Sequence, residues 1–164
     1  MGNEVAFTEL ASMLNVNKET VERYVDLLEK SYIIFRLSPF SRNLRNELKK
    51  MRKIYFYDNG VRNALINNYN PLLLRNDVGA LWENFIISER RKWTDSIELH
   101  TNRYFWRNHQ KREVDYLEEY GGDIHAYEIK WNKYKKPAKV FVDAYFPKTI
   151  ECINKENYYS LLGL

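Results

Sequence analysis

The sequence predicts a mixed fold of the α/β or α+β class. Stretches with helical spacing of apolar residues alternate with short runs of β-branched and aromatic residues, and the rear part reads helix, strands, helix and strand. Hydrophobic residues make up 45% and charged residues 29% of the chain, as in globular proteins. With 164 residues and no internal repeat, the chain suits one domain, or two small ones, with a real core.

The composition also excludes several classes of protein. No apolar run approaches the roughly 20 residues of a membrane span, and the N-terminus shows no apolar signal region. Cys152 is the single cysteine, so an internal disulfide is excluded. We therefore expect a cytoplasmic protein without membrane contact. The net charge of +4 permits nucleic acid as a partner but argues for it only mildly.

Two short helices are predicted near the N-terminus. Thr8 is expected to cap the first and Asn17 the second, because both residue types accept hydrogen bonds from free N–H groups of a first helical turn. Val16 lies in the short link and is expected to fill the space between the helices. Apolar residues recur at helical spacing in the second helix: Val21, Tyr24, Val25 and Leu28. Residues 5–30 resemble the helix-turn-helix family of DNA-binding domains.

A hairpin with a basic tip is predicted next. Residues 32–37 read as a strand and residues 54–58 as the returning strand. Six basic residues precede or enter the return strand, against the single acid Glu47: Arg42, Arg45, Lys49, Lys50, Arg52 and Lys53. Helices followed by such a hairpin resemble a winged helix, in which the second helix enters the major groove and the wing contacts phosphates.

Two features qualify this DNA-binding interpretation. The outer face of the second helix carries four acids, which oppose contact with phosphates: Glu19, Glu22, Asp26 and Glu29. The basic hairpin is therefore the better predicted phosphate contact, and a packing role for the two helices stays open. Winged helices usually have one more helix in front, so the chain is expected to be a fragment of a longer protein.

The rear part begins with two helices. One is predicted within residues 61–68 and ends before Asn70-Pro71. The other covers residues 78–93 and ends in a basic cluster, residues 90–92, that suits a helix C-terminus. Glu83 lies among large apolar residues of this helix, where a lone acid is costly unless a partner neutralises it. The remaining elements are predicted as strands at 96–101, 103–107, 112–119 and 123–131, a helix at 138–146 and a strand at 149–154.

Acids and a lysine are placed to meet on two neighbouring strands. Strand geometry puts Glu113, Asp115 and Leu117 on one face, opposite Val114 and Tyr116. On the next strand the same geometry groups three residues: Ala126, Glu128 and Lys130. Adjacent strands can thus direct Asp115, Glu128 and Lys130 toward one point.

This pattern resembles the restriction-endonuclease-like, or PD-(D/E)XK, superfamily, whose signature is an Asp followed by an acid-x-Lys triplet. Over nearly its whole length the chain also resembles the uncharacterised domain that follows AAA-type ATPase modules in bacterial and archaeal proteins. Blocks such as "RKIYFYDNGVRNAL", "GALWENFIISE", "WRNHQKREVDYL" and "YEIKW" occur in the family's order. One departure is Val114, where many superfamily nucleases have proline before the Asp.

The resemblance implies two domains. Residues 1–57 would form a winged helix truncated at its N-terminus, and residues 58–164 a restriction-endonuclease-like mixed sheet flanked by helices. It also implies an upstream ATPase module as a partner. The chain has no G-x-x-x-x-G-K-[ST] loop, so ATP would act only through that absent module.

The resemblance further implies a Mg²⁺ site and DNA as the substrate or ligand. Asp115 and Glu128 would bind the metal, with Glu83 as an additional ligand or a supporting acid. Lys130 would orient the attacking water or offset negative charge. A basic track beyond the strand would follow the nucleic acid through Lys133, Lys135 and Lys136.

Simpler interpretations stay open beside this one. Glu128 and Lys130 can form an ordinary salt bridge on an exposed strand, and the lysines can form a solvated face. In that case the chain is a catalytically inactive module that binds DNA or protein for the ATPase. A third hypothesis is homo-oligomerisation through exposed aromatic surface.

Overall fold

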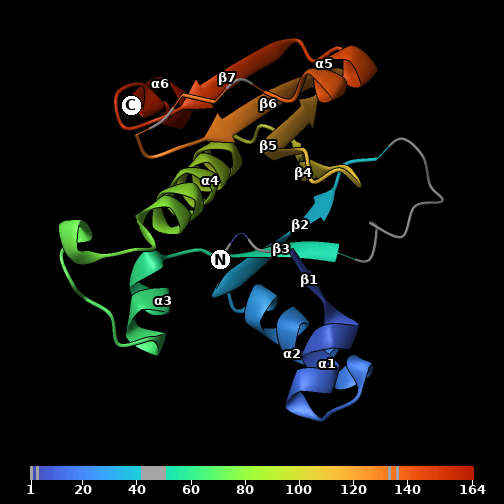
Figure 1. The fold of residues 1–164 in the computed structure, drawn as a ribbon, viewed down its shortest axis with the longest axis vertical. Helices are drawn as coiled ribbons and strands as arrows, with labels where there is room; N and C mark the ends of the chain where they lie inside the picture. Colours follow the sequence, from blue (N-terminus) through green and yellow to red (C-terminus); the bar gives the residue numbers. More distant parts are fainter. Residues whose placement is uncertain (1, 3, 42–50, 133, 136) are drawn as a thin grey trace.

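The computed structural model describes residues 2, 4–41, 51–132, 134–135 and 137–164. Within these residues the chain forms one mixed seven-stranded sheet, in the order β1-β3-β2-β4-β5-β6-β7, with six α-helices (Figure 1). The predicted mixed α and β class is therefore confirmed. Of the described helices, none combines the length and apolar character needed to cross a lipid bilayer.

Most of the predicted helices and strands are present, whereas β1 and α6 were not predicted. The strands are β1 (Glu4–Ala6), β2 (Ile34–Pro39), β3 (Met51–Phe56), β4 (Asn102–Arg107), β5 (Glu113–Tyr120), β6 (Asp123–Ile129) and β7 (Thr149–Ile153). The helices are α1 (Phe7–Leu14), α2 (Lys18–Lys30), α3 (Asn59–Leu65), α4 (Val78–Ser96), α5 (Lys139–Tyr145) and α6 (Tyr158–Leu162), with a short 3-10 turn, η2, at Leu72–Leu74.

The N-terminal part packs α1 and α2 against three strands. β2 and β3 form the predicted antiparallel hairpin, with Phe35 opposite Tyr55, and β1 adds antiparallel to β3. A small apolar cluster fills the space beneath the helices: Ala11, Val21, Val25 and Ile34. The cap at Asn17 is confirmed, because its side chain accepts the Thr20 N–H at 2.7 Å.

Two local predictions in this part are wrong. α1 begins at Phe7, its preceding residue is Ala6, and Thr8 lies inside the first turn instead of capping it. Val16 is 41% exposed and does not fill the space between the helices. Its N–H instead bonds to the Ala11 carbonyl, as Asn15 in the left-handed conformation (φ 53°) reverses the chain. The helix end is thus closed by backbone hydrogen bonds.

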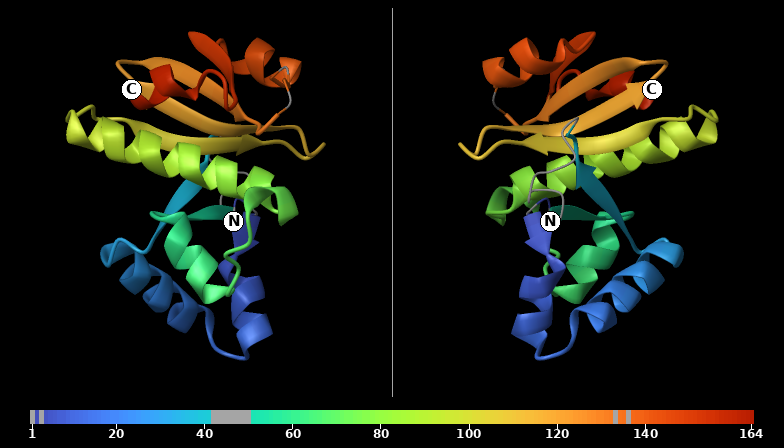
Figure 2. Two further views of the ribbon diagram at one scale, coloured as in Figure 1. Left: turned by 90° about the vertical axis from the view of Figure 1, so that its left-hand side faces the viewer. Right: turned by 90° about the vertical axis from the view of Figure 1, so that its right-hand side faces the viewer.

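The rear part is an antiparallel run β4-β5-β6, extended by parallel β7. A short parallel pairing of β2 with β4, at Ser38 and Tyr104, joins it to the N-terminal part. α4 and α6 pack on one face of the sheet around Trp82, Ile86 and Leu161, and α5 covers the other face with Phe141. Figure 2 shows α4 as the long helix between the upper strands and the N-terminal part.

The predicted strand at residues 96–101 is wrong. α4 continues through Ser96, and the Ile97 N–H bonds to the Trp93 carbonyl while the Leu99 N–H bonds to Thr94. These hydrogen bonds pair the last backbone carbonyl groups of a longer helix. The segment forms no strand in the sheet of the described residues. The basic cluster at residues 90–92 consequently lies inside α4 and not at its C-terminus.

The division into residues 1–57 and 58–164 stays a prediction. Strands from both sides of that boundary share the sheet through the β2–β4 pairing.

Candidate functional site

Adjacent strands β5 and β6 bring Asp115, Glu128 and Lys130 together. The Lys130 ammonium forms an ion pair with Asp115 Oδ2 and lies 3.5 Å from Glu128 Oε2. Asp115 is 1% exposed and Glu128 is fully buried, whereas about a quarter of the Lys130 side chain reaches solvent. Two carboxylates and one amine therefore meet at a largely desolvated point, where charges interact strongly.

A β-bulge places Asp115 at this point. Tyr104 pairs with Leu117 and Trp106 pairs with Val114, so two steps along β4 match three along β5. The extra residue breaks the alternation, and Val114 and Leu117 lie in the same apolar cluster. The prediction that Leu117 shares a face with Asp115 is therefore wrong. At the bulge the Asp115 carboxylate accepts a hydrogen bond from the Ile129 N–H of β6 at 2.8 Å.

Glu83 of α4 is paired by residues of the N-terminal part. The Tyr55 hydroxyl donates a hydrogen bond of 2.6 Å to Glu83 Oε1, and the Lys53 ammonium lies 3.6 Å from the same oxygen. Burial raises the pKa of Glu83, and the Asp115 charge adds to this, whereas Lys53, Tyr55 and Lys130 oppose it. The Asp115 and Lys130 charges thus act on Glu83.

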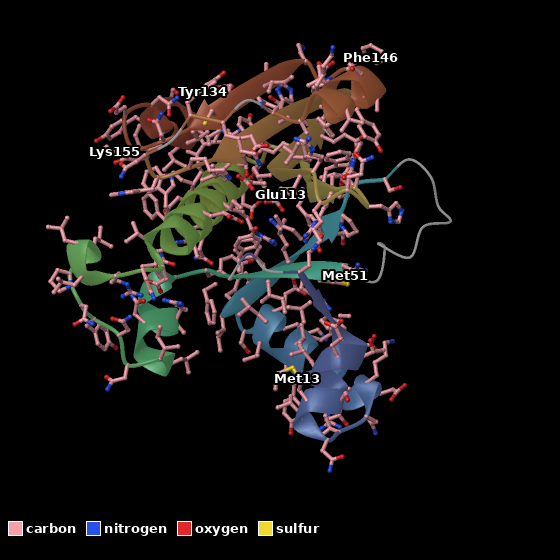
Figure 3. All side chains as sticks on the ribbon, in the orientation of Figure 1. Met13, Met51, Glu113, Tyr134, Phe146 and Lys155 are labelled. Atoms are coloured by element: carbon pink, nitrogen blue, oxygen red, sulfur yellow. The ribbon has the colours of Figure 1, made fainter. Side chains whose placement is uncertain are left out.

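An open pocket of about 490 Å³ lies beside these groups. It is lined by Gly2, which precedes β1, and by residues of β1, β3, α4, β4 and β5: Glu4, Met51, Lys53, Ala80, Glu83, Arg107 and Glu113. Arg107 is paired with Glu4 at 2.5 Å. Figure 3 places Glu113 near the middle of the molecule, while Tyr134, Phe146 and Lys155 lie at its periphery. Because the pocket is open and lined by Glu83 and Lys53, solvent can reach both side chains through it.

Glu128 has the most unusual environment of the three acids. Neither of its oxygens accepts a hydrogen bond within the described residues, although the Lys135 and Lys130 amines lie 3.2 and 3.5 Å from Oε2. Burial, followed by the Asp115 charge, raises the pKa of Glu128 to about 7. A buried carboxylate whose oxygens accept no hydrogen bond within the described residues is suited to receive a proton or a cation.

This pKa shift predicts a pH-dependent stability. Because the folded-state pKa lies above the ordinary value of 4.5, the favourable contribution is complete below pH 4.5 and is lost as the pH rises through 7. Relative to the wild type, Glu128→Gln should therefore gain on the order of 2 kcal/mol of unfolding free energy between pH 4.5 and pH 8. Urea unfolding of both proteins at several pH values measures this difference, and a difference that stays constant with pH would contradict it.

The carboxylates fit Mg²⁺ by chemical type but do not form a ready-made cage. In the described part of the chain, no three His, Cys, Asp or Glu side chains are grouped so as to hold a metal ion. Mg²⁺ typically uses one or two protein carboxylates and retains several waters, so Asp115 and Glu128 would suffice as its protein ligands. Their site currently includes the Lys130 amine between them.

The predicted nucleic-acid contacts are placed unevenly. Six of them lie outside the described residues: Arg42, Arg45, Lys49, Lys50, Lys133 and Lys136. Arg52 and Lys53 lie on β3 and not at the hairpin tip, because that strand already begins at Met51. Lys53 is only 3% exposed and borders the pocket. It therefore does not lie on an outer surface, where the sequence predicted a phosphate contact. Lys135 is half-exposed and pairs with Glu128.

Sequence reasoning missed two sets of residues. One is the pair formed by Lys53 and Tyr55 at Glu83, which only tertiary packing brings together. The other is a buried ion pair, in which the Arg90 guanidinium donates to both carboxylate oxygens of Glu118 at 2.8 and 2.6 Å. Arg90 follows Ile86 and Ile87 at helical spacing, a signal that it faces the core and not solvent.

Comparison with known proteins places this site within a family. The family model described as "Domain of unknown function (DUF4143)" matches residues 78–159, which is half of the chain. The chain belongs to the DUF4143 family. The DUF4143 match contains Glu83, Asp115, Glu128 and Lys130. A second model, "Domain of unknown function (DUF8612)", matches residues 1–72, which include Lys53 and Tyr55.

Two curated relatives are similar to this DUF4143 chain. They are described as uncharacterized proteins of Mycobacterium bovis and Mycobacterium tuberculosis, and each is 31% identical over 124 residues. The match covers 74% of this chain but 27% of each relative, so the chain spans about a quarter of their length. No solved structure matches the chain significantly.

Proposed function

We propose that this chain is the C-terminal part of an AAA-type ATPase protein, whose Mg²⁺-dependent, nuclease-like DUF4143 domain acts on or binds DNA. The observation that carries the proposal is the Lys130 amine between Asp115 and Glu128 at neighbouring strands, and the charges of Asp115 and Lys130 also act on Glu83 of α4. The resemblance to PD-(D/E)XK nucleases assigns chemistry to this arrangement. The mycobacterial relatives are several times longer than the match, which leaves room in them for an ATPase module.

Each residue has a role in the proposed reaction. Asp115 and Glu128 would hold Mg²⁺, which would neutralise charge on a phosphodiester and lower the pKa of a bound water. Lys130, already hydrogen-bonded to Asp115, would orient the water or balance negative charge as it develops. Glu83 would hold further water or assist in binding the cation.

The N-terminal part supports DNA as the partner. The two helices, the β2–β3 hairpin and the added strand β1 support the proposed winged helix. Two of the α2 acids that argued against DNA contact, Asp26 and Glu29, are paired with Arg36 of β2. Their charge is thereby partly balanced, which lowers the expected repulsion of phosphates.

The direct test is cleavage of single- and double-stranded DNA in the presence of Mg²⁺ or Mn²⁺. Cleavage by Lys130→Ala is expected to be slower by about 100-fold or more, as when a positioned catalytic side chain is removed. Lys148→Ala is the matched control, because Lys148 pairs with Asp123 at the far end of β6, on the surface. Equal cleavage by the wild type and Lys130→Ala, or none by either, would exclude a nuclease.

A second candidate is a catalytically inactive module that binds DNA or protein for the same ATPase. The observation that favours it is that amines of Lys130 and Lys135 already neutralise the two strand carboxylates. Labelled duplex DNA titrated at several salt concentrations tests it, since phosphate contacts make affinity fall steeply with salt. Homo-oligomerisation stays a prediction that sedimentation would test.

A further inference from the structure

The segment between β3 and α4 exposes its apolar side chains and withdraws several of its polar ones. Every large apolar side chain from residue 61 to residue 74, on α3, on η2 and between them, is exposed: Val61, Leu65, Ile66, Tyr69, Leu72, Leu73 and Leu74. Leu73 is 98% exposed. Single exposed leucines are ordinary in folded proteins, but a group of this size marks an interaction surface.

Polar side chains hold this segment in one defined arrangement. The Arg75 guanidinium donates to both carboxylate oxygens of Asp77, at 2.8 and 2.9 Å. It also donates to the Asn68 carbonyl at 2.6 Å and to Asn63 Oδ1 at 3.0 Å. Arg62 of α3 forms an ion pair with the same Asp77 carboxylate, and the Arg75 side chain is only 2% exposed. These bonds tie the chain after η2 to α3, so the fold itself presents the apolar side chains to solvent.

The surface lies on the outside of the molecule and carries no unpaired charge. Figure 1 shows α3 projecting on the side away from β4 and α5, and the left-hand view of Figure 2 faces this side. The charged side chains between residues 59 and 77, all of which the structure describes, are Arg62, Arg75 and Asp77, and they pair with one another. The outward surface is therefore formed by apolar and amide side chains.

The size of this surface matches what a dimer requires. The exposed parts of the seven side chains amount to on the order of 800 Å², about the area that each partner contributes to a standard interface. The largest apolar patch on a monomer is typically about 300–600 Å². A surface without unpaired charge is also complementary to itself, so two copies can bring the same face together around a two-fold axis although each carries a net charge of +4.

The exposed apolar residues of α2 lie in a different setting. Tyr24 and Leu27 border an open pocket whose other lining residues are charged: Glu19, Glu22, Arg23, Asp26 and Lys30. An interface there would have to desolvate many charges, which the cores of protein interfaces avoid. The surface around Leu73 needs no such desolvation, and this difference favours it as the contact between copies.

We infer that residues 61–74 form a homodimer interface, in which α3 and η2 of one copy pack against the same elements of a second copy. The inference assigns a mostly leucine surface to homo-oligomerisation, which the sequence predicted through aromatic residues. It stands on this apolar surface alone and does not depend on the proposed DNA or metal chemistry.

Sedimentation velocity of the 164-residue chain, from about 1 to 100 µM, tests the inference. The wild type is expected to reach twice the chain mass of 19.9 kDa. Leu65→Lys and Leu73→Lys each place a charge in the interface and should weaken association by about 100-fold or more. Leu73→Met keeps an apolar side chain and should associate like the wild type. Leu27→Lys is the matched control, because Leu27 is 58% exposed outside this segment.

Three results would overturn the inference. One is a wild type that stays monomeric at about 100 µM, in which case a different protein would have to cover the surface. Another is association that Leu65→Lys and Leu73→Lys leave unchanged, and the third is association that Leu27→Lys weakens equally. Circular dichroism and urea unfolding verify that the variants are folded. If Leu65→Lys unfolds, Leu73→Lys decides, because the Leu73 side chain is almost fully exposed in the single chain.

Discussion

Arg90→Met should lower the free energy of unfolding by about 3–5 kcal/mol, the usual cost of breaking a buried ion pair from one side. Glu118 is fully buried and receives both guanidinium hydrogen bonds, and Arg90 also donates to the Leu161 carbonyl at 2.7 Å. Methionine leaves a buried carboxylate whose remaining hydrogen-bond donor, among the described residues, is the Tyr116 hydroxyl, and it removes the hydrogen bond between α4 and α6. Urea unfolding followed by circular dichroism measures the change.

Two comparisons make this prediction specific. Arg91→Met alters the next residue of α4, whose guanidinium lies over the rings of Phe35 and Tyr57. Its ion pair with the exposed Asp95 is long, at 3.7 Å. The substitution should cost about 1 kcal/mol, as for other partly exposed ion pairs and cation–π contacts. The double variant Arg90→Met with Glu118→Met should recover much of the loss, because no charge is then left unpaired. A double variant no more stable than Arg90→Met would contradict this account.

Asp115→Ala should cost about 2–4 kcal/mol, because it leaves a buried N–H unsatisfied and removes the closest partner of a partly buried ammonium. The Ile129 N–H loses its acceptor, and among the described residues the ion-pair partner left to Lys130 is Glu128, at 3.5 Å. Chemical unfolding in urea again gives the value.

Asp123→Ala is the control for this variant. Asp123 also forms an ion pair with a lysine, but at the exposed end of β6, and should cost less than about 1 kcal/mol. Asp115→Asn should fall between the two, because its amide oxygen can still accept the Ile129 N–H while the charge is lost. If Asp115→Ala cost no more than Asp123→Ala, the Asp115 contacts would be structurally unimportant.

Predictions from local pattern succeeded where one strand or helix decides the outcome. The three strands around residues 103–107, 112–119 and 123–131 follow from alternating apolar residues, and the Asn17 cap follows from the chemistry of one side chain. The failures need information from a second element. A strand was expected at residues 96–101, but α4 continues into this segment. The side chains of β5 were assigned to the wrong faces because its bulge depends on the pairing with β4.

The sequence by itself determined that two neighbouring strands carry Asp115, Glu128 and Lys130, and that Glu83 needs a partner. These conclusions follow from the two-residue period of a strand and from the cost of burying an isolated charge. Only the tertiary structure decided that Lys53 and Tyr55 of β3 are those partners, and that Arg90 is buried against Glu118. Residues 28 positions apart meet because strand pairing and helix docking bring them together, and such contacts leave no periodic signal in the chain.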